Sequence, residues 1–208
     1  RVREDATYLI TGGTGGLGLA VARRLIERGA RYLALVSRHP PDGDALRALG
    51  ANVRHFVADV SDEQAMRAVF ETIARELPSL RGVVHAAGIL DDAVIAQQDR
   101  ARLAAVFAAK VDGSRILDRL TRTLPLDFFV LFSSAGALLG SPGQANQAAA
   151  NAWMDVLAHA RRRAGFPAVS IAWAAWSDIG SAAEAAKLLA QRGIQPITAE
   201  LGLDAFET

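Results

Sequence analysis

The chain has 208 residues and 51% of them are hydrophobic, so it is long enough to bury the core of one ordinary domain. Its 23 basic and 22 acidic residues leave a net charge of +1, which gives no reason to expect nucleic acid or an acidic membrane surface as a partner. There is no cysteine, the four histidines lack metal-ligand spacing, and no apolar run reaches the roughly 18 residues of a membrane span, so we expect a soluble, cytoplasmic protein without disulfides, metal or membrane segment.

The first predicted elements are a strand, a glycine-rich turn and a helix. Thr7–Thr11 is a short apolar run that ends in glycines. The apolar residues Leu17, Val21 and Leu25 repeat at a spacing of four, which predicts a helix. Gly29 follows as its expected C-terminal stop.

Two further strands and a second helix come next. Tyr32–Ser37 and Val53–Ala58 are predicted strands. Ser61 is the expected N-cap of the following helix, with Gln64 three residues on as its capping-box partner. The apolar face of this helix consists of Met66, Val69, Phe70, Ile73 and Leu77.

The second half of the chain repeats the alternation of strand and helix. The strands are expected at Gly82–Gly88, Asp127–Ser134 and Ala168–Trp173. The helices are expected at Asp99–Arg122 and Gln144–Arg163.

The strands are continuously apolar, which is typical of a parallel sheet covered on both faces. Together with the alternation, this predicts an α/β fold, a doubly wound parallel sheet of the Rossmann type. After Trp176 the chain becomes alanine-rich and helical without another clear strand. We therefore expect residues 1–208 to form a single domain.

The turn "TGGTGGLG" between the first strand and the first helix predicts dinucleotide binding. Glycines let the backbone approach a pyrophosphate, and the helix N-terminus points free N–H groups at it. A glycine-rich loop can also be no more than a tight turn, so the signal depends on its strand–turn–helix setting. The predicted contacts are Thr11, Gly12, Gly13, Thr14, Gly15, Gly16, Leu17 and Gly18.

The second strand ends in Ser37 and Arg38, where an NAD-binding protein would carry an acidic residue. A hydroxyl and a cation suit a 2′-phosphate, so the expected cofactor is NADPH, although Arg38 can also be a solvated loop residue. Asp59 is either an acceptor for the adenine amine or a helix-entry residue beside Val60.

Five motifs carry a resemblance to a known family: "TGGTGGLG", "HAAGILDD" (85–92), "KVDGSRILD" (110–118), "LFSSAGALLGSPGQANQAAANAWMD" (131–155) and "SIAWAAW" (170–176). The chain resembles a short-chain dehydrogenase/reductase, and more closely the catalytic subdomain of a ketoreductase domain from a modular type I polyketide synthase. The resemblance implies further cofactor contacts at Val60, Ala86, Ala87 and Gly88.

The resemblance implies hydride transfer from NADPH to a β-ketone, with a serine and a tyrosine meeting the new oxyanion and a lysine and an asparagine supporting the proton relay. Ser134 matches the serine, Lys110 the lysine and Asn151 the asparagine, whereas Gln147 stands at the tyrosine position. A phenol has a pKa of about 10 and can act as an acid, but a primary amide has no comparable proton.

Each assignment has a plainer alternative. The thirteen-residue spacing to Gln147 selects Ser134 over Ser133, although either hydroxyl can cap a turn. Lys110 can be a solvated helix residue, and Asn151 can be a residue without a role in a helix interior where asparagine has poor propensity. His85 is expected to be a structural histidine with its hydrogen bonds satisfied.

The sequence is consistent with two main hypotheses: an active but slowed ketoreductase, and a catalytically silent domain that packs against neighbouring domains. An epimerase-type role in the same cleft also stays open. The only two tyrosines, Tyr8 and Tyr32, belong to early strands and are expected to be too far away to replace the missing phenol.

The motif Leu90, Asp91, Asp92 resembles the fingerprint of ketoreductases that give a (3R), B-type hydroxyl, and Leu139 stands where the opposite type carries tryptophan. As bare residues, the two aspartates can equally form a solvated turn. The resemblance further implies an acyl carrier protein bearing a phosphopantetheine-linked β-ketoacyl chain, a structural ketoreductase subdomain and neighbouring synthase domains. We thus expect an excerpt of a larger polypeptide.

Overall fold

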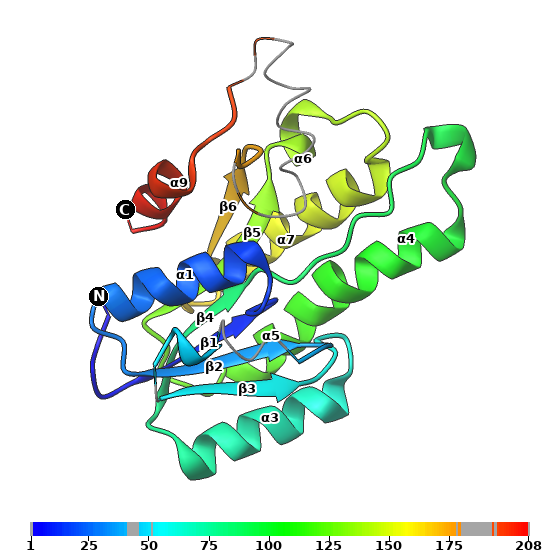
Figure 1. Ribbon diagram of the computed structural model, residues 1–208. Helices are drawn as coiled ribbons and strands as arrows, with labels where there is room; N and C mark the ends of the chain where they lie inside the picture. The colour runs from blue at the N-terminus through cyan, green and yellow to red at the C-terminus, as the bar shows by residue number, and fades with distance from the viewer. Residues whose placement is uncertain are drawn as a thin grey trace.

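The computed structural model contains one six-stranded, fully parallel sheet with helices on both faces (Figure 1). The structure describes residues 2–40, 46–50, 52–177, 179, 193 and 195–207. The strand order is β3-β2-β1-β4-β5-β6, which is the predicted doubly wound arrangement. The strands are β1 (Thr7–Thr11), β2 (Tyr32–Ser37), β3 (Val53–Val57), β4 (Leu80–His85), β5 (Phe128–Ser134) and β6 (Val169–Trp173).

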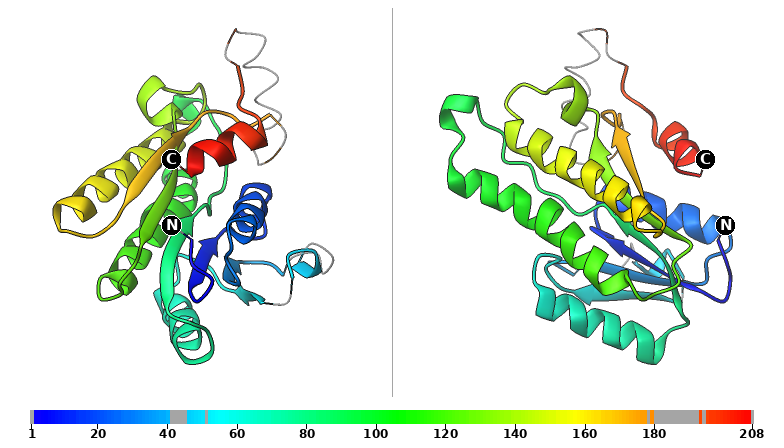
Figure 2. Two further views of the ribbon diagram at one scale, coloured as in Figure 1. Left: turned by 90° about the vertical axis from the view of Figure 1, so that its left-hand side faces the viewer. Right: turned by 180° about the vertical axis from the view of Figure 1, so that it is seen from behind.

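The helices form two outer layers, which the left view of Figure 2 shows edge-on. One layer holds α1 (Gly16–Glu27) and α9 (Ala199–Phe206). The other holds α3 (Glu63–Glu76), α5 (Gly113–Thr121) and α7 (Ala145–Arg163). The remaining short elements are η1 (Ile95–Gln97), α4 (Arg100–Phe107), η2 (Ala108–Asp112) and α6 (Gly136–Leu139).

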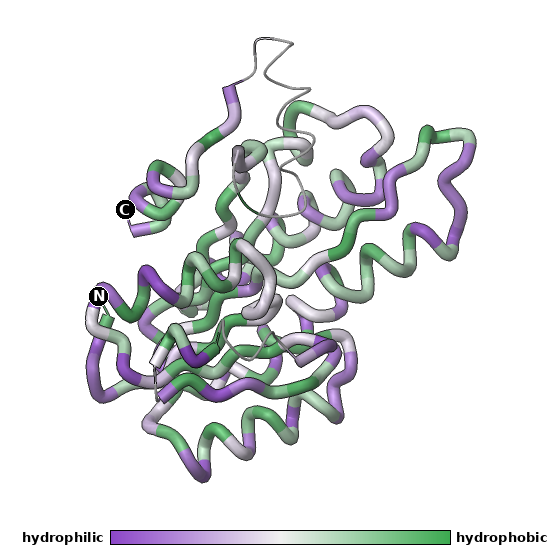
Figure 3. Tube along the Cα trace, viewed as in Figure 1, coloured by the Kyte–Doolittle hydropathy of each residue, from purple (hydrophilic) through white to green (hydrophobic). Residues whose placement is uncertain are grey.

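Two apolar cores, one on each face of the sheet, hold these layers together. Strand β1 is buried along its whole length and separates them, with Leu9 in one core and Ile10 in the other. Figure 3 shows the strands as mainly hydrophobic tubes. The prediction of strands covered on both faces is correct for the central strands but wrong for β3 and β6, because these lie at the sheet edges and several of their side chains stay exposed.

The predicted N-cap of α3 is wrong by one residue. Asp62, not Ser61, caps the helix, and its carboxylate accepts a hydrogen bond of 3.0 Å from the Ala65 N–H. The cause is Asp59, whose Oδ1 accepts from both the N–H and the hydroxyl of Ser61, at 2.9 and 2.7 Å. Ser61 is thereby held in the turn before the helix.

The helix predicted over Asp99–Arg122 is interrupted. It consists of α4, then η2 as a π-helical turn, then α5, which ends at Thr121. At Gly113 a Cβ would lie 2.7 Å from Val60 and 3.3 Å from the His85 ring, so the helix packs unusually closely on the sheet at this point. Apolar spacing does not reveal such a contact, and π-turns often mark functional sites.

Other boundaries also differ from expectation. Strand β4 ends at His85 rather than Gly88, so residues 86–88 leave the sheet. Gly29 has φ +100° directly after the C-cap of α1, as its predicted role as a helix stop requires. Most of the alanine-rich stretch after Trp176 lies outside the described residues. Among the helices that are described, none is long and apolar enough to cross a membrane.

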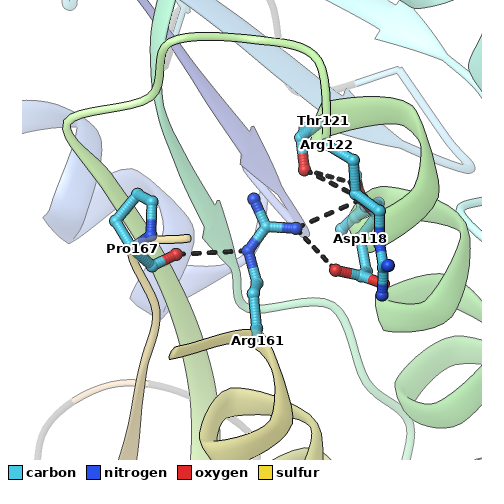
Figure 4. A network of polar contacts seen from close by, with 6 residues as sticks. Asp118, Thr121, Arg122, Arg161 and Pro167 are labelled. Carbon is cyan, nitrogen blue, oxygen red and sulfur yellow. Dashed lines mark hydrogen bonds and ion pairs between the residues drawn. The ribbon is translucent and has the colours of Figure 1, made fainter. Parts of the chain in front are cut away.

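A buried ion pair fixes α7 to α5 (Figure 4). Arg161, 1% exposed, donates to the Asp118 carboxylate at 2.6 Å and to the Pro167 carbonyl at 3.1 Å. Its guanidinium also lies 4.2 Å from the centre of the Phe129 ring. Asp118 holds a second cation, Arg122, at 2.8 Å. The network therefore ties α5 to the C-terminal end of α7.

Candidate active site

A cavity of about 350 Å³ lies at the carboxyl ends of β1, β2 and β4, where the strand order of the sheet reverses. Parallel α/β sheets bind ligands in this crevice. Most of the predicted cofactor residues line it: Gly12, Thr14, Gly15, Gly16, Leu17, Gly18, Ser37, Arg38, Asp59, Val60, Ala86, Ala87 and Gly88.

The glycine turn has the close packing that a dinucleotide site needs. Gly12 has φ +67°, and a Cβ there would lie 2.8 Å from the Ala86 backbone. A Cβ on Gly18 would lie 2.2 Å from the Gly12 carbonyl oxygen. Helix α1 starts at Gly16 with no side-chain cap and no acidic residue in its first turn, so its N–H groups and positive dipole end are available to an anion.

Two of the predicted contacts, Thr11 and Gly13, support the turn from behind. Thr11 is fully buried, and its Oγ1 lies 2.6 Å from His85 Nδ1. At Gly13 a Cβ would lie 2.9 Å from the Leu35 side chain. These residues therefore shape the turn that a nucleotide would meet, and the cavity wall is built by their neighbours.

The second strand brings one cation to the cavity. The Ser37 hydroxyl donates to the His39 carbonyl at 2.7 Å and also contacts His55 Nε2 at 2.7 Å, so its proton is already engaged. Arg38 is exposed and forms no ion pair within the described part of the chain. Burial raises the pKa of Asp59, but its two hydrogen bonds from Ser61 and the nearby Arg38 charge outweigh burial, and the net shift is downward. Asp59 is thus a carboxylate that shapes the turn while it lines the cavity.

Lys110 lies on the π-turn η2, which packs on α7 and α4. Its Nζ donates to the Phe132 carbonyl at 3.2 Å, and a Cβ on Gly88 would lie 3.6 Å from the same atom. The amine therefore sits between the ends of β4 and β5, next to the cavity wall. Burial lowers the pKa of Lys110 to about 8, although the charge of Asp155 acts in the opposite direction.

Ser134 is the last residue of β5 and is half-buried. Its Oγ accepts a hydrogen bond of 3.1 Å from the Gly136 N–H. A hydroxyl that accepts in this way keeps its own proton free to donate. Ser133, the alternative, is buried, and its hydroxyl reaches the Asn151 carbonyl at 3.5 Å.

Gln147 and Asn151 lie one turn apart on α7, and both are buried. The Gln147 side-chain N–H donates to the Ile89 carbonyl. Asn151 Oδ1 is buried without a hydrogen-bond partner among the described residues, so it can accept from a bound water or substrate group. The Gln147 amide is therefore used to hold the chain after β4.

The residues Leu90, Asp91 and Asp92 form a loop that is tied to the start of α7. Asn146 donates to the Asp91 carbonyl at 2.8 Å, and Gln144 donates to the Asp92 carboxylate at 2.8 Å. Asp91 also pairs with Arg102, while Leu90 is 43% exposed. The loop is thus fixed by specific contacts, in contrast to the solvated turn that bare aspartates suggest.

The two tyrosines lie at the wrong end of the sheet. Tyr8 and Tyr32 are near the amino ends of β1 and β2, and the cavity is at the carboxyl ends. The Tyr8 hydroxyl contacts the backbone of Arg3. Neither phenol can reach the group formed by Lys110 and Ser134.

Sequence reasoning missed the contributions of Asn146, Gln144 and His85. The amides Gln144 and Asn146, just before Gln147, were a signal, but their hydrogen-bond partners lie 52 and 55 residues away in the chain. His85 was expected to have its hydrogen bonds satisfied: its Nδ1 contacts Thr11 Oγ1, and its ring lies close to the Ala109 and Lys110 backbone, where Nε2 makes no contact of hydrogen-bond geometry. Burial lowers the pKa of His85 to about 3, with the Lys110 charge adding to the shift.

A family model described as "KR domain" matches residues 6–178. The chain belongs to the ketoreductase-domain family of modular polyketide synthases. The motif-based identification is therefore confirmed, together with the Rossmann-type fold.

Relatives of this ketoreductase chain are far longer multidomain proteins. Polyketide synthase GfsA of Streptomyces halstedii is 46% identical over 211 residues, which cover 97% of this chain and 3% of that protein. The 6-methylsalicylic acid synthase of Aspergillus terreus is 40% identical, over 98% of this chain and 13% of its own length.

Solved structures share the whole fold of the chain. One described as A-type ketoreductases from a modular polyketide synthase superposes with a TM-score of 0.90 at 39% identity, covering 100% of this chain and 46% of that chain. PlmKR1, the ketoreductase from the first module of phoslactomycin biosynthesis in a Streptomyces species, has a TM-score of 0.90 at 42% identity, covering 99% and 50%. The ketoreductase chain thus spans about half the length of these structures.

Proposed function

We propose that this chain binds NADPH and reduces the β-ketone of an acyl thioester to a (3R), B-type β-hydroxyacyl product, at a rate limited by Gln147. The proposal rests on one observation: the glycine-turn cavity and the residues Lys110 and Ser134 lie together at the carboxyl end of the sheet. The glycine-turn cavity shares Gly88 with the Lys110 amine, and Ser134 follows two residues after the carbonyl that holds this amine.

The residues of the cavity fit NADPH. The turn around Gly12 and Gly18 leaves no room for side chains, and the uncapped start of α1 suits a pyrophosphate. Arg38 suits a 2′-phosphate, and Asp59 is an acceptor on the adenine side. When bound, NADPH would supply the hydride for the ketone.

Ser134 and Lys110 would meet the charge that develops on the ketone oxygen. The Ser134 proton is free because its oxygen accepts from Gly136, so it can donate to the oxyanion. The Lys110 ammonium keeps donors beyond the one used on the Phe132 carbonyl, and it stabilises negative charge nearby. Asn151 Oδ1 provides a buried acceptor for a water that relays protons from solvent.

With Gln147 at the position proposed for the tyrosine, the site lacks a side chain that can give a proton directly to the ketone oxygen. The Gln147 side-chain N–H is held by the Ile89 carbonyl, and an amide has no acidic proton to give. General acid catalysis contributes typically 10²–10⁴-fold to a rate, so turnover through water should be slower by about this factor.

The loop of Leu90, Asp91 and Asp92 supports the B-type assignment. Its contacts with Asn146 and Gln144 place it against the start of α7, beside the residue at the tyrosine position. Leu139, where the opposite type carries tryptophan, is 84% exposed. A substrate chain guided along this loop would present one face of its ketone.

The relatives support a setting within a larger polyketide synthase. The substrate would arrive on the phosphopantetheine arm of an acyl carrier protein, in the cytoplasm, with no nucleic acid or membrane involved. Residues 1–208 would act as the catalytic subdomain of a larger polypeptide, beside a structural subdomain and other synthase domains. The matched ketoreductase structures, about twice as long as this chain, support this arrangement.

The test is reduction of a β-ketoacyl thioester with NADPH or NADH, followed by chiral analysis of the hydroxy product. The proposal expects slow oxidation of NADPH, weaker use of NADH and an excess of the (3R) product. A (3S) product would refute the B-type assignment.

The alternative is a silent domain with a packing role, which the engagement of Gln147 with Ile89 favours. It predicts no product above the background without protein. NADPH binding followed by fluorescence separates a silent domain that kept its nucleotide site from one that lost it.

A further inference from the structure

Lys110 is one of two lysines among the 23 basic residues of the chain, the other being Lys187. Its amine lies over Gly88, a residue of the cavity wall, with 3.6 Å between Nζ and a Cβ built there. Lys110 is half-buried as a residue. Its amine therefore lies directly beside the wall of the cavity at Gly88.

The surroundings of this amine raise its neutral fraction above that of an ordinary lysine, although the ammonium still predominates near neutral pH. Nζ donates to the Phe132 carbonyl at 3.2 Å, and among the described residues no carboxylate pairs with it. Asp155 on α7 acts only through space, and its Oδ1 already accepts from Ser170 at 2.5 Å. His85 on β4 is neutral, because burial lowers its pKa to about 3.

The residue at position 147 also leaves the Lys110 amine without an acidic partner. An acidic phenol at Gln147 would give the amine a partner to which it could pass or from which it could take a proton. The Gln147 amide offers no such proton, and it donates to Ile89 instead. The amine is left without an acid–base partner among the described side chains.

We propose that Lys110 is a nucleophilic amine that forms an imine with the ketone of a β-ketoacyl chain or a related β-dicarbonyl compound. The inference rests on the proposed function only for the class of ligand that enters the cleft. It goes beyond reduction, because imine formation needs neither a nucleotide nor a proton from Gln147.

The step is balanced without an oxidant or reductant. The neutral amine adds to the ketone carbon and forms a carbon–nitrogen bond, giving a carbinolamine. Its hydroxyl leaves as water, which carries away the ketone oxygen and both amine hydrogens. With a β-dicarbonyl compound, a proton then moves from the central carbon to nitrogen, and the product is a conjugated enamine.

The expected selectivity follows from the fraction of neutral amine. Burial lowers the pKa of Lys110 from 10.5 to about 8. Near neutral pH this difference leaves on the order of 100-fold more neutral amine than an ordinary lysine has. Lys110 should therefore react in the folded chain well before any solvated lysine does.

The experiment uses 2,4-pentanedione as the probe, since its enamine absorbs in the near ultraviolet. A parallel sample is treated with an acetoacetyl thioester and cyanoborohydride, and the modified lysine is located by peptide mass spectrometry. Lys110→Arg keeps the charge without the nucleophile, and Lys187→Arg is the matched control. A wild-type sample in urea reports the reactivity of both lysines in the unfolded chain.

The proposal expects an adduct on Lys110 in wild type and in Lys187→Arg, with a rate that rises with pH around a midpoint near 8. In urea the preference for Lys110 should disappear. No adduct, or equal labelling of both lysines in the folded chain, overturns the proposal even if Lys110→Arg fails to fold. Absence of NADPH binding or reduction in the same samples counts against the proposed reductase alone, because the diketone needs no nucleotide.

Discussion

The buried ion pair between α5 and α7 predicts losses in the free energy of unfolding that depend on which member of the network is substituted. In Asp118→Asn the guanidinium of Arg161, which is 1% exposed, keeps its positive charge and loses its carboxylate. Leaving one member of a buried pair uncompensated typically destabilises by about 3–5 kcal/mol. The cation–π contact with the Phe129 ring, 4.2 Å from the guanidinium carbon, is made by both forms and so leaves this difference unchanged. We expect a net loss of about 3 kcal/mol.

Substitution of Arg161 or Arg122 should reduce the free energy of unfolding by less than substitution of Asp118. In Arg161→Met the Asp118 carboxylate keeps Arg122 at 2.8 Å, so the loss should be about 1–3 kcal/mol from unmade hydrogen bonds and packing. Arg122→Ala removes a side chain that is 53% exposed, and the loss should be at most about 1 kcal/mol. Removing Asp118 and Arg161 together should recover stability relative to Asp118→Asn alone.

The assay is urea unfolding followed by circular dichroism, with a check that the dependence of unfolding free energy on urea is unchanged. For a chain of this size about 3 kcal/mol corresponds to a fall in Tm of about 10 °C. The reasoning would be refuted if Asp118→Asn were no more destabilising than Arg122→Ala.

Three further predictions test other parts of the site. Arg38→Ala should weaken NADPH binding about 10–100-fold and leave NADH binding nearly unchanged. The reason is that one charge-assisted hydrogen bond, here to the 2′-phosphate, contributes about 1.5–3 kcal/mol. Competitive titration of the two nucleotides measures both affinities. Gly18→Ala should abolish nucleotide binding, since its Cβ would lie 2.2 Å from the Gly12 carbonyl oxygen, and retained binding would show that the turn can move. The free energy of unfolding should fall as pH is lowered from 6.5 towards 3, by up to about 1.4 kcal/mol per pH unit. The reason is that the unfolded chain lets His85 bind a proton that the folded chain excludes. Urea titrations at pH 7 and pH 5 should show a smaller loss for His85→Asn than for wild type.

The fold was largely predictable from the sequence because its signals are local. Apolar runs such as Tyr32–Ser37 and the glycine turn before α1 each specify an element without reference to distant residues. The alternation of strands and helices then predicted the doubly wound class of the sheet. The N-cap of α3 was missed because Asp59 competes for Ser61, a detail of hydrogen bonding rather than of pattern.

The candidate site was predictable as a set of residues but not as a set of contacts. Lys110, Ser134 and Asn151 were named from motifs, whereas the π-turn that carries Lys110 depends on Gly113 packing against Val60 and His85. The bond from Gln147 to the Ile89 carbonyl joins residues far apart in the chain. Contacts of this kind arise from tertiary packing, which single-sequence patterns do not encode.

The central claim is that this cleft binds and orients a β-ketone but lacks an acid at position 147. Its most direct test is the rate of β-ketoacyl thioester reduction by wild type, Gln147→Tyr and Gln147→Phe at saturating NADPH. The account predicts that the tyrosine variant is about 10²–10⁴-fold faster than wild type, and that phenylalanine, which fills the space without the hydroxyl, brings no gain. A wild-type rate equal to that of Gln147→Tyr would contradict it.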